Sequence, residues 1–360
     1  MEDKKHIFTY TNKDFVYDVC RMNENTTNVR SRFDVALKCG WAEKMKLGLF
    51  RYHLGDLETR VLAGNCGYIA QLNIQRGIER RKPQTILSIQ QQFDSTLFNF
   101  NKIKSAEILF EMRKAEEILA EKDCARNQTS AMSFVIINSS PLEFGHCLLV
   151  PEPSRCHPQI LIPSALQIGI ESLFLSADPG YKVGFNSLGA FASVNHLHLH
   201  GYYLNPPLNI EWAHTELICP KNSLYRLMNF PKAFMFYADV QVEVRAVADT
   251  VCKLTDFLVK RNIAHNVFMT RGCPPDSEDK PLSLVRHGVR IFIWPRVSCF
   301  GAKEESGFNV ALCELAGHLP LKNREDFEHL DEDGVKEIVQ KYLLSDEEFS
   351  DLEKQLVKHL

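Results

Sequence analysis

A row of three histidines is the stretch of this sequence best suited to chemistry. His196, His198 and His200 alternate with Leu197 and Leu199. Side chains alternate between the two faces of a β-strand, so the imidazoles share one face, about 7 Å apart, and the leucines can enter a core. Three interpretations compete: a chance cluster on a half-exposed strand, a zinc site with His-x-His ligands, and covalent catalysis in which a neutral imidazole attacks phosphorus.

The segment that leads into the histidines favours covalent catalysis. It is rich in small and hydrogen-bonding residues. Gly184 and Gly189 allow the backbone to approach a ligand closely, and Asn186, Ser187 and Ser193 offer hydrogen bonds to phosphate oxygens or to a ribose. An ordinary Asn-Ser turn has the same composition, so the segment alone does not decide the question.

Two motifs together resemble the histidine-triad superfamily, in which a strand beginning Gly-His and ending at Pro comes before a His-x-His-x-His strand. Here residues 145–151 precede residues 196–200 in that way. More narrowly, the chain resembles the GDP-hexose phosphorylases, relatives of galactose-1-phosphate uridylyltransferase, over about residues 40 to 330. The segments that carry this narrower resemblance are 93–94, 98–100, 139–153, 185–204 and 301–318.

The resemblance implies a nucleophile and a reaction. The family's nucleophile is the middle histidine of the motif, which is His198 here. The reaction implied is phosphorolysis of GDP-D-glucose by inorganic phosphate, which gives GDP and D-glucose 1-phosphate through a guanylyl-histidine intermediate. The resemblance also implies that a backbone carbonyl near His196 holds the other ring nitrogen of His198. This scheme needs no cofactor and no metal.

The third position of the motif leaves the acceptor open. Uridylyltransferases and the plant GDP-galactose enzymes carry Gln there, whereas this chain carries His200, which is typical of the hydrolase branches. Hydrolysis is therefore an alternative, as is a nucleotidylyltransferase or hydrolase acting on another nucleotide sugar or dinucleotide. A zinc enzyme and a catalytically silent binding protein are the alternatives from other classes.

The remaining site residues follow from their types. We expect His196 to orient the row and His200 to hydrogen-bond the non-bridging phosphate oxygens. Residues 76–83 form a basic run, which is either a solvated loop or a clamp for phosphate. His146 is either a core histidine or a support for the nucleotide. The substrate-binding candidates are Asn186, Ser187, Gly189, Ser193, Arg80 and Lys102.

Composition indicates an ordinary soluble globular protein, and the cysteine pattern favours the cytoplasm. The 360 residues are 45% hydrophobic and 24% charged, and the net charge of −3 argues against a general nucleic-acid binder. Neither a signal peptide nor a run of about 20 apolar residues is evident, so no membrane association is expected. Eleven cysteines without a Cys-x-x-Cys motif suit reduced thiols.

Hydrophobic periodicity predicts a mixture of helices and strands, and the family resemblance implies an α+β fold of the histidine-triad type, with antiparallel sheets flanked by helices. The strand-helix-strand-strand order occurs twice, which indicates two related halves and favours a monomer. We expect a flexible leader at 1–35, a catalytic half at 36–210, a non-catalytic half at 211–330 and a helical tail at 331–360. The predicted helices are 33–49, 105–121, 164–175 and 242–261, and the predicted strands are 60–63, 68–72, 131–138, 145–151, 195–204, 233–238, 266–270 and 289–294.

Four basic residues of the second half, Arg271, Arg290, Arg296 and Lys303, can reach substrate or remain surface charges. Glu314 and His318 are spaced as neighbours on one helical turn, so we expect an intrahelical pair or a polar lining.

Overall fold

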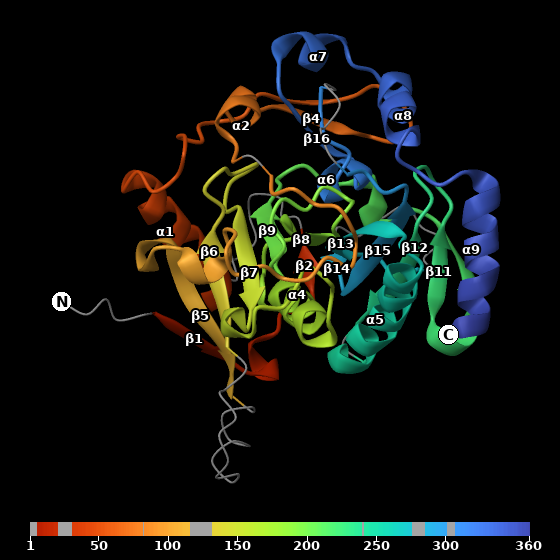
Figure 1. The fold of residues 1–360 in the computed structure, drawn as a ribbon, viewed down its shortest axis with the longest axis horizontal. Helices are drawn as coiled ribbons and strands as arrows, with labels where there is room; N and C mark the ends of the chain where they lie inside the picture. The colour runs from red at the N-terminus through yellow and green to blue at the C-terminus, as the bar shows by residue number, and fades with distance from the viewer. Residues whose placement is uncertain are drawn as a thin grey trace.

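An eleven-stranded sheet carries the histidine segment and organises the fold (Figure 1). The computed structural model describes residues 6–20, 31–81, 83–115, 132–239, 241–275, 285–300 and 307–360. All neighbouring strands of the sheet are antiparallel except β1 and β5. In spatial order the strands are β1 (Ile7–Tyr10), β5 (Ile108–Lys114), β6 (Ser133–Ile137), β7 (Cys147–Pro151), β9 (Leu199–Tyr203), β8 (Tyr181–Asn186), β13 (Ala264–Gly272), β15 (Gly288–Arg296), β12 (Phe234–Ala238), β11 (Leu224–Leu227) and β10 (Thr215–Cys219).

Two helices, α4 (Pro163–Leu175) and α5 (Val244–Lys260), pack against one face of this sheet (Figure 1). Helix α5 is amphipathic, and its buried residues Val247, Val251, Leu254 and Leu258 recur at helical spacing and enter that core. The other helices are α1 (Arg32–Lys46), α2 (Ile74–Glu79), α6 (Leu312–Leu315), α7 (Arg324–His329), α8 (Glu332–Gln340) and α9 (Asp346–His359).

A second core lies on the opposite face of the sheet. The central strands supply both cores, because Val267 and Met269 of β13 face the helices whereas Phe268 faces the other way. Such strands are buried on both faces and read as continuous apolar runs. A three-stranded sheet, β16 (His318–Leu321), β4 (Ile69–Leu72) and β3 (Thr59–Val61), stands at this side with α7 and α8 (Figure 1).

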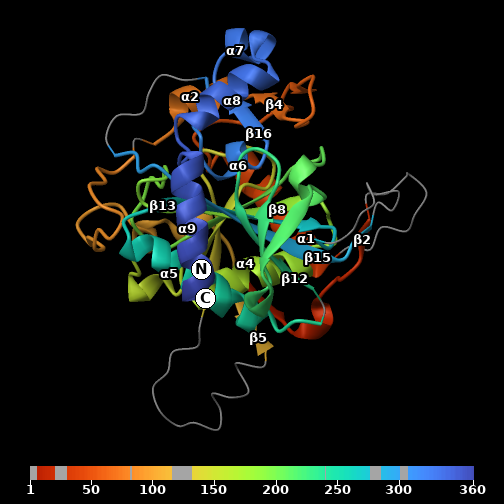
Figure 2. The same ribbon diagram turned by 90° about the vertical axis from the view of Figure 1, so that its right-hand side faces the viewer.

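The small sheet joins distant parts of the chain, because β4 (Ile69–Leu72) pairs with β16 (His318–Leu321), in parallel. A further short pair, β2 (Val19–Cys20) with β14 (Val285–Arg286), does the same. At the C-terminal end, α9 lies along the side of the molecule that faces the viewer in Figure 2. Its Phe349 stacks on Phe234 of β12, with the ring centroids 4.8 Å apart. No helix within the described ranges is both long enough and apolar enough to cross a bilayer.

The strand order contains a repeat. Strands β5, β6, β7, β9 and β8 follow one another in space as β10, β11, β12, β15 and β13 do, and in each set a helix, α4 or α5, comes before the last two strands along the chain. The two sets meet where β8 pairs with β13. The α+β class, the antiparallel sheet and the flanking helices are thus confirmed, while the relatedness of the two halves stays a prediction.

Part of the expected flexible leader is built into the sheet. Strand β1 pairs with β5, and its residues Phe8 and Tyr10 are buried in the core beneath α1. The sequence analysis missed this strand because only four residues carry it, in a polar context. Residues 1–5 and 21–30 of that leader lie outside the described residues.

Two other sequence predictions are wrong. The predicted helix 105–121 is a short 3₁₀ turn (Ser105–Glu107) followed by strand β5, and its residues 116–121 lie outside the described residues. Burial on both faces of β5 produced the apolar run that resembled a helix. The intrahelical pair of Glu314 and His318 does not form either, because α6 ends at Leu315 and His318 begins β16; the alternative, a polar lining, fits Glu314, which lines the cavity described below.

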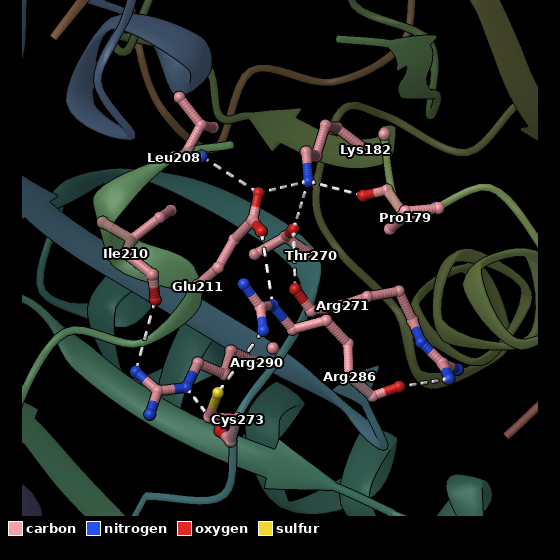
Figure 3. A network of polar contacts seen from close by, with 12 residues as sticks. Pro179, Lys182, Leu208, Ile210, Glu211, Thr270, Arg271, Cys273, Arg286 and Arg290 are labelled. Atoms are coloured by element: carbon pink, nitrogen blue, oxygen red, sulfur yellow. Dashed lines mark hydrogen bonds and ion pairs between the residues drawn. The ribbon is translucent and has the colours of Figure 1, made fainter. Parts of the chain in front are cut away.

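A buried ionic network lies at the junction of the two halves (Figure 3). Lys182 of β8 donates to Glu211 Oε1 at 2.8 Å and to Thr270 Oγ1 of β13 at 2.7 Å. Arg286 lies 3.5 Å from the other oxygen of Glu211. Arg290 of β15 donates to backbone carbonyls of the same region, including that of Cys273 at 2.7 Å. One carboxylate therefore compensates several buried cations.

We expect Glu211→Gln to lower the free energy of unfolding by about 3–5 kcal/mol, because it leaves Lys182 and Arg286 buried without a counter-charge. Urea denaturation measures the loss. Asp249→Asn is the matched control, because it breaks a half-exposed pair with Arg245 and should cost less than about 1 kcal/mol. Equal losses in the two variants would contradict the assignment.

Candidate active site

A cavity of about 800 Å³ opens between the large sheet and the loops that follow β4 and β16. Its floor carries His198 and His200, and its walls come from both halves of the chain. Apolar side chains line one part and charged or amide side chains line the rest. A ligand with both an apolar and an anionic part suits such a lining.

His198 is held in one tautomer. The residue is 2% exposed, and its Nδ1 lies 2.7 Å from the backbone carbonyl of His196. A carbonyl oxygen can only accept, so Nδ1 carries the proton and Nε2 carries the lone pair. Burial lowers the pKa of His198 to about 4. The imidazole is therefore neutral at pH 7 and has a nucleophilic nitrogen on a side chain that lines the cavity.

His200 is set up as a proton donor by His146. The backbone N–H of Leu142 donates to His146 Nδ1 at 2.9 Å, so the proton of His146 is on Nε2. That nitrogen lies 3.0 Å from His200 Nδ1, which must accept and leaves the proton of His200 on Nε2. Burial and neighbouring positive groups, Arg76 among them, hold the pKa of His200 well below its usual range. His146 thus fixes a tautomer rather than contacting the cavity.

The histidine row is only partly a strand. Strand β9 begins at Leu199, so His196 and His198 lie in the bent segment before it, not within the strand that the sequence analysis placed at 195–204. Leu197 and Leu199 are nevertheless fully buried in the core beneath α4, as predicted. Hydrogen bonds from side chains replace the missing ladder pairing of this segment.

Gln159 supplies most of those hydrogen bonds. Its Oε1 accepts from the backbone N–H of His198 at 3.0 Å, and its Nε2 donates to the carbonyls of His198 at 3.1 Å and Asn186 at 3.0 Å. Asn195 closes the brace, because its Oδ1 accepts from the backbone N–H of Gln159 at 2.9 Å. A single buried glutamine therefore ties the backbone of His198 to the end of β8.

Asn186 stands at the end of β8 and lines the cavity. Its Oδ1 accepts from Asn266 Nδ2 at 2.6 Å and from the backbone N–H of Leu312 at 3.1 Å. Both partners belong to the second half of the chain. Because the oxygen is engaged twice, the amide N–H₂ is the group that Asn186 offers to a ligand.

Cations line the wall opposite the histidines. Arg76 of α2 and Arg80, just after α2, come from the first half, and Lys322 follows β16. Arg76 donates to the carbonyl of Ser140 and is thereby oriented. Burial and the nearby Arg76 lower the pKa of Arg80 to about 10, so it stays protonated at pH 7. This wall is suited to phosphate groups.

The structure brings together some of the predicted residues. His198, His200, Asn186, Ser193 and Arg80 line one cavity. That these residues bind substrate or take part in catalysis stays a prediction.

Four predicted residues are absent from the lining. Lys102 Nζ donates to the carbonyls of Thr96 and Leu97, and Gly189 occupies a turn with φ +76°. Ser187 Oγ accepts from the backbone N–H of His265 at 2.9 Å. His196 lies behind His198, where its Nδ1 accepts from the backbone N–H of Phe100 at 3.0 Å. That His196 orients the row stays a prediction.

The second-half arginines do not reach the cavity. Arg271, Arg290 and Arg296 are each no more than 1% exposed and bind backbone carbonyls. They are neither ligand contacts nor surface charges. Lys303 lies outside the described residues. Within the described ranges, no three His, Cys, Asp or Glu side chains are grouped as metal ligands.

Sequence reasoning missed Gln159, Arg76 and Lys322 as individual residues. Arg76 belonged to the basic run 76–83 that was singled out. Gln159 and Lys322 carried no local signal, because they reach the site only through tertiary contacts.

Comparison with solved structures identifies the class of fold. The crystal structure of yeast Ap4A phosphorylase Apa2 in complex with Ap4A matches with a TM-score of 0.54 over 86% of this chain and 96% of that chain, at 15% identity. The free Apa2 structure matches with a TM-score of 0.53. At this identity the likeness shows a shared fold.

Sequence comparison identifies the family. The profile described as "GDPGP1-like, N-terminal domain" matches residues 32–202, and that described as "GDPGP1-like, C-terminal domain" matches residues 210–360. The chain therefore belongs to the GDPGP1-like family. Relatives include GDP-D-glucose phosphorylase 1 of Danio rerio, 57% identical over 98% of both chains, and of Homo sapiens, 44% identical over 97% of this chain and 91% of that one. GDP-L-galactose phosphorylase 1 of Arabidopsis thaliana is 31% identical over 87% of this chain and 70% of its own.

We expect Gln159→Leu to lower the free energy of unfolding by about 3 kcal/mol, because it leaves buried backbone groups of His198 and Asn186 unpaired. Urea denaturation measures the change. The control is Gln340→Ala, at the exposed end of α8, which should change stability by less than about 0.5 kcal/mol. A Gln159→Leu protein as stable as the control would refute the bracing role.

Proposed function

We propose that this chain catalyses the phosphorolysis of GDP-D-glucose by inorganic phosphate, giving GDP and D-glucose 1-phosphate. The observation that carries the proposal is the fixed tautomer of His198, with Nδ1 on the carbonyl of His196 and a neutral Nε2 on the cavity side. Family membership and the names of the relatives support the substrate.

The first step forms a covalent intermediate. His198 Nε2 attacks the phosphorus attached to guanosine, the N–P bond forms, and the P–O bond to the bridging oxygen breaks. D-Glucose 1-phosphate leaves with the electron pair of that bond. The leaving group is a phosphate and hence a weak base, so a strong general acid is not needed. The second step reverses the geometry: an oxygen of inorganic phosphate attacks the same phosphorus, the N–P bond breaks, and GDP forms.

The flanking groups stabilise the charge that develops at phosphorus. His200 Nε2–H and the amide N–H₂ of Asn186 are donors for the non-bridging oxygens. Arg76 and Arg80 balance the charge of the leaving phosphate and then of the incoming one. A neutral His200 can donate without adding a second cation beside His198.

One alternative has an observation in its favour. His200 occupies the third motif position, so water can replace phosphate as the acceptor and the chain would then hydrolyse GDP-D-glucose. The relatives named GDP-L-galactose phosphorylase favour phosphate as acceptor, with the hexose differing. We further propose a cytoplasmic monomer, in line with the eleven cysteines without a Cys-x-x-Cys motif.

The two halves are, in this proposal, related by duplication, which the repeated strand order supports. In the spatial order, β15 (Gly288–Arg296) stands in the second set where β9 stands in the first. The second half therefore carries Arg290, buried among backbone carbonyls, on the strand that corresponds to the one with His200. Strand β15 itself carries no histidine.

Incubation with GDP-D-glucose labelled in the guanosine-linked phosphate, without added phosphate, should give one guanylyl adduct per chain on His198, detectable by mass. Added phosphate should discharge it to GDP. His198→Asn should lose the adduct and reduce turnover by at least about 10⁴-fold, because the nucleophile is gone. His265→Asn is the control, since His265 is buried outside the cavity lining. Labelling that survived in His198→Asn would reject the mechanism.

His200→Gln separates the two acceptors. If the third position selects the acceptor, we expect the ratio of GDP to GMP formed at fixed phosphate to change by about tenfold or more. Product analysis by chromatography measures this ratio. An unchanged ratio at unchanged kcat would mean that His200 takes no part in acceptor choice.

A further inference from the structure

The cavity has one apolar compartment beside the nucleophile. We call it the apolar slot, and it is lined by Phe98, Phe100, Ile103, Ile136, Leu148 and Val194. The ring of Phe100 lies 5.0 Å from the ring of His198. A flat apolar group that is attached through a few bonds to the phosphorus at His198 fits this slot. In the proposed substrate that group is the nucleobase, so the inference rests on the proposed function.

The other part of the lining suits a different group. Asn309, Asn323, Asp326 and Lys322 lie on the wall formed by the second half. Amide and carboxylate side chains hydrogen-bond sugar hydroxyls, whereas the apolar slot offers a hydroxylated ring few partners. The base and the hexose are therefore distinguished by the chemistry of the two parts of the cavity.

Two charged side chains accompany the apolar slot. Glu107 ends the 3₁₀ turn before β5, and its Oε1 accepts from the backbone N–H of Lys104 at 3.2 Å. The guanidinium of Arg81 lies over the ring of Phe98, 3.3 Å from its centroid. Both side chains line the cavity. Burial lowers the pKa of Arg81, and the nearby Arg51 lowers it further. The negative charge of Glu107 raises it in part, so the two charges interact. Among the described residues, Glu107 is the only carboxylate of the cavity lining that comes from the first half of the chain.

We propose that Glu107 and Arg81 read the edge of guanine. Guanine presents an acceptor at O6 next to donors at N1–H and the N2 amino group. A carboxylate accepts from both donors, and a guanidinium donates to O6. Adenine reverses this order, because its amino group would face Arg81 and its N1 lone pair would face the carboxylate. The pair therefore attracts guanine and repels adenine.

Base analogues separate the two roles. Hypoxanthine keeps O6 and N1–H and lacks the N2 amino group. The experiment measures kcat and KM for GDP-, IDP- and ADP-glucose with phosphate, in wild type, Glu107→Gln and Arg81→Gln. Glu43→Gln on α1 is the control, since Glu43 is exposed and outside the cavity lining. Melting temperatures of all proteins exclude unfolding as the cause.

We expect Glu107→Gln to lower kcat/KM for GDP-glucose by about 10–100-fold, mainly through KM, and for IDP-glucose by only a few-fold. The preference for guanine over hypoxanthine should therefore collapse. Arg81→Gln should lower both values alike and leave that preference intact, because both bases carry O6. A folded Glu107→Gln protein with the wild-type order of base preference would overturn the proposal.

Equilibrium binding of GDP, IDP and ADP to the same proteins tests the base contacts without turnover. If wild type consumed no nucleotide sugar but bound GDP best, with the preference lost in Glu107→Gln, the proposed function would fail and the base assignment would stand. If wild type bound the three nucleotides equally, the base assignment would fail whatever the turnover.

Discussion

The hydrogen bond from His198 Nδ1–H to the carbonyl of His196 is the contact on which the site depends. It decides which ring nitrogen holds the lone pair, and it exists only while the backbone between the two residues keeps its bend. Gln159 and Asn195 hold that bend from outside, and Leu197 anchors it in the core from below. The same backbone bend is therefore required both for the hydrogen bond of His198 and for the packing of Leu197 in the core.

Electrostatics divides the cavity into neutral and charged groups. Burial keeps His146, His198 and His200 neutral, since each has a lowered pKa. The positive charge that a diphosphate needs comes from Arg76 and Arg80 instead. This separation matters because a protonated His198 would attract phosphate without attacking it. The pairing of β4 with β16 brings the segments that carry Arg76, Arg80 and Lys322 next to each other.

The sequence allowed the chemistry to be predicted better than its supporting structure. Alternation alone placed Leu197 and Leu199 in the core, and His198 and His200 line one cavity. Composition could not tell a side chain that faces a ligand from one that satisfies the backbone, so Ser187 and Gly189 were assigned to binding although they build a turn. Strand β5 was mistaken for a helix because burial on both faces removes the period-two signal. Gln159 was invisible because its three partners are distant in sequence.

Arg290 lies on β15, the strand that corresponds to β9 in the proposed duplication, and it is held by the carbonyls of Cys273, Ile210, Ala213 and Pro274. Because these carbonyls bind the Arg290 guanidinium, we interpret the second half as structural support for the first. Genetic variants along the one sheet then divide into two kinds. Changes at the residues of β8 and β9 that line the cavity alter the kinetics of a folded protein, whereas changes in the buried ionic network around Glu211 and Arg290 reduce the amount of folded protein.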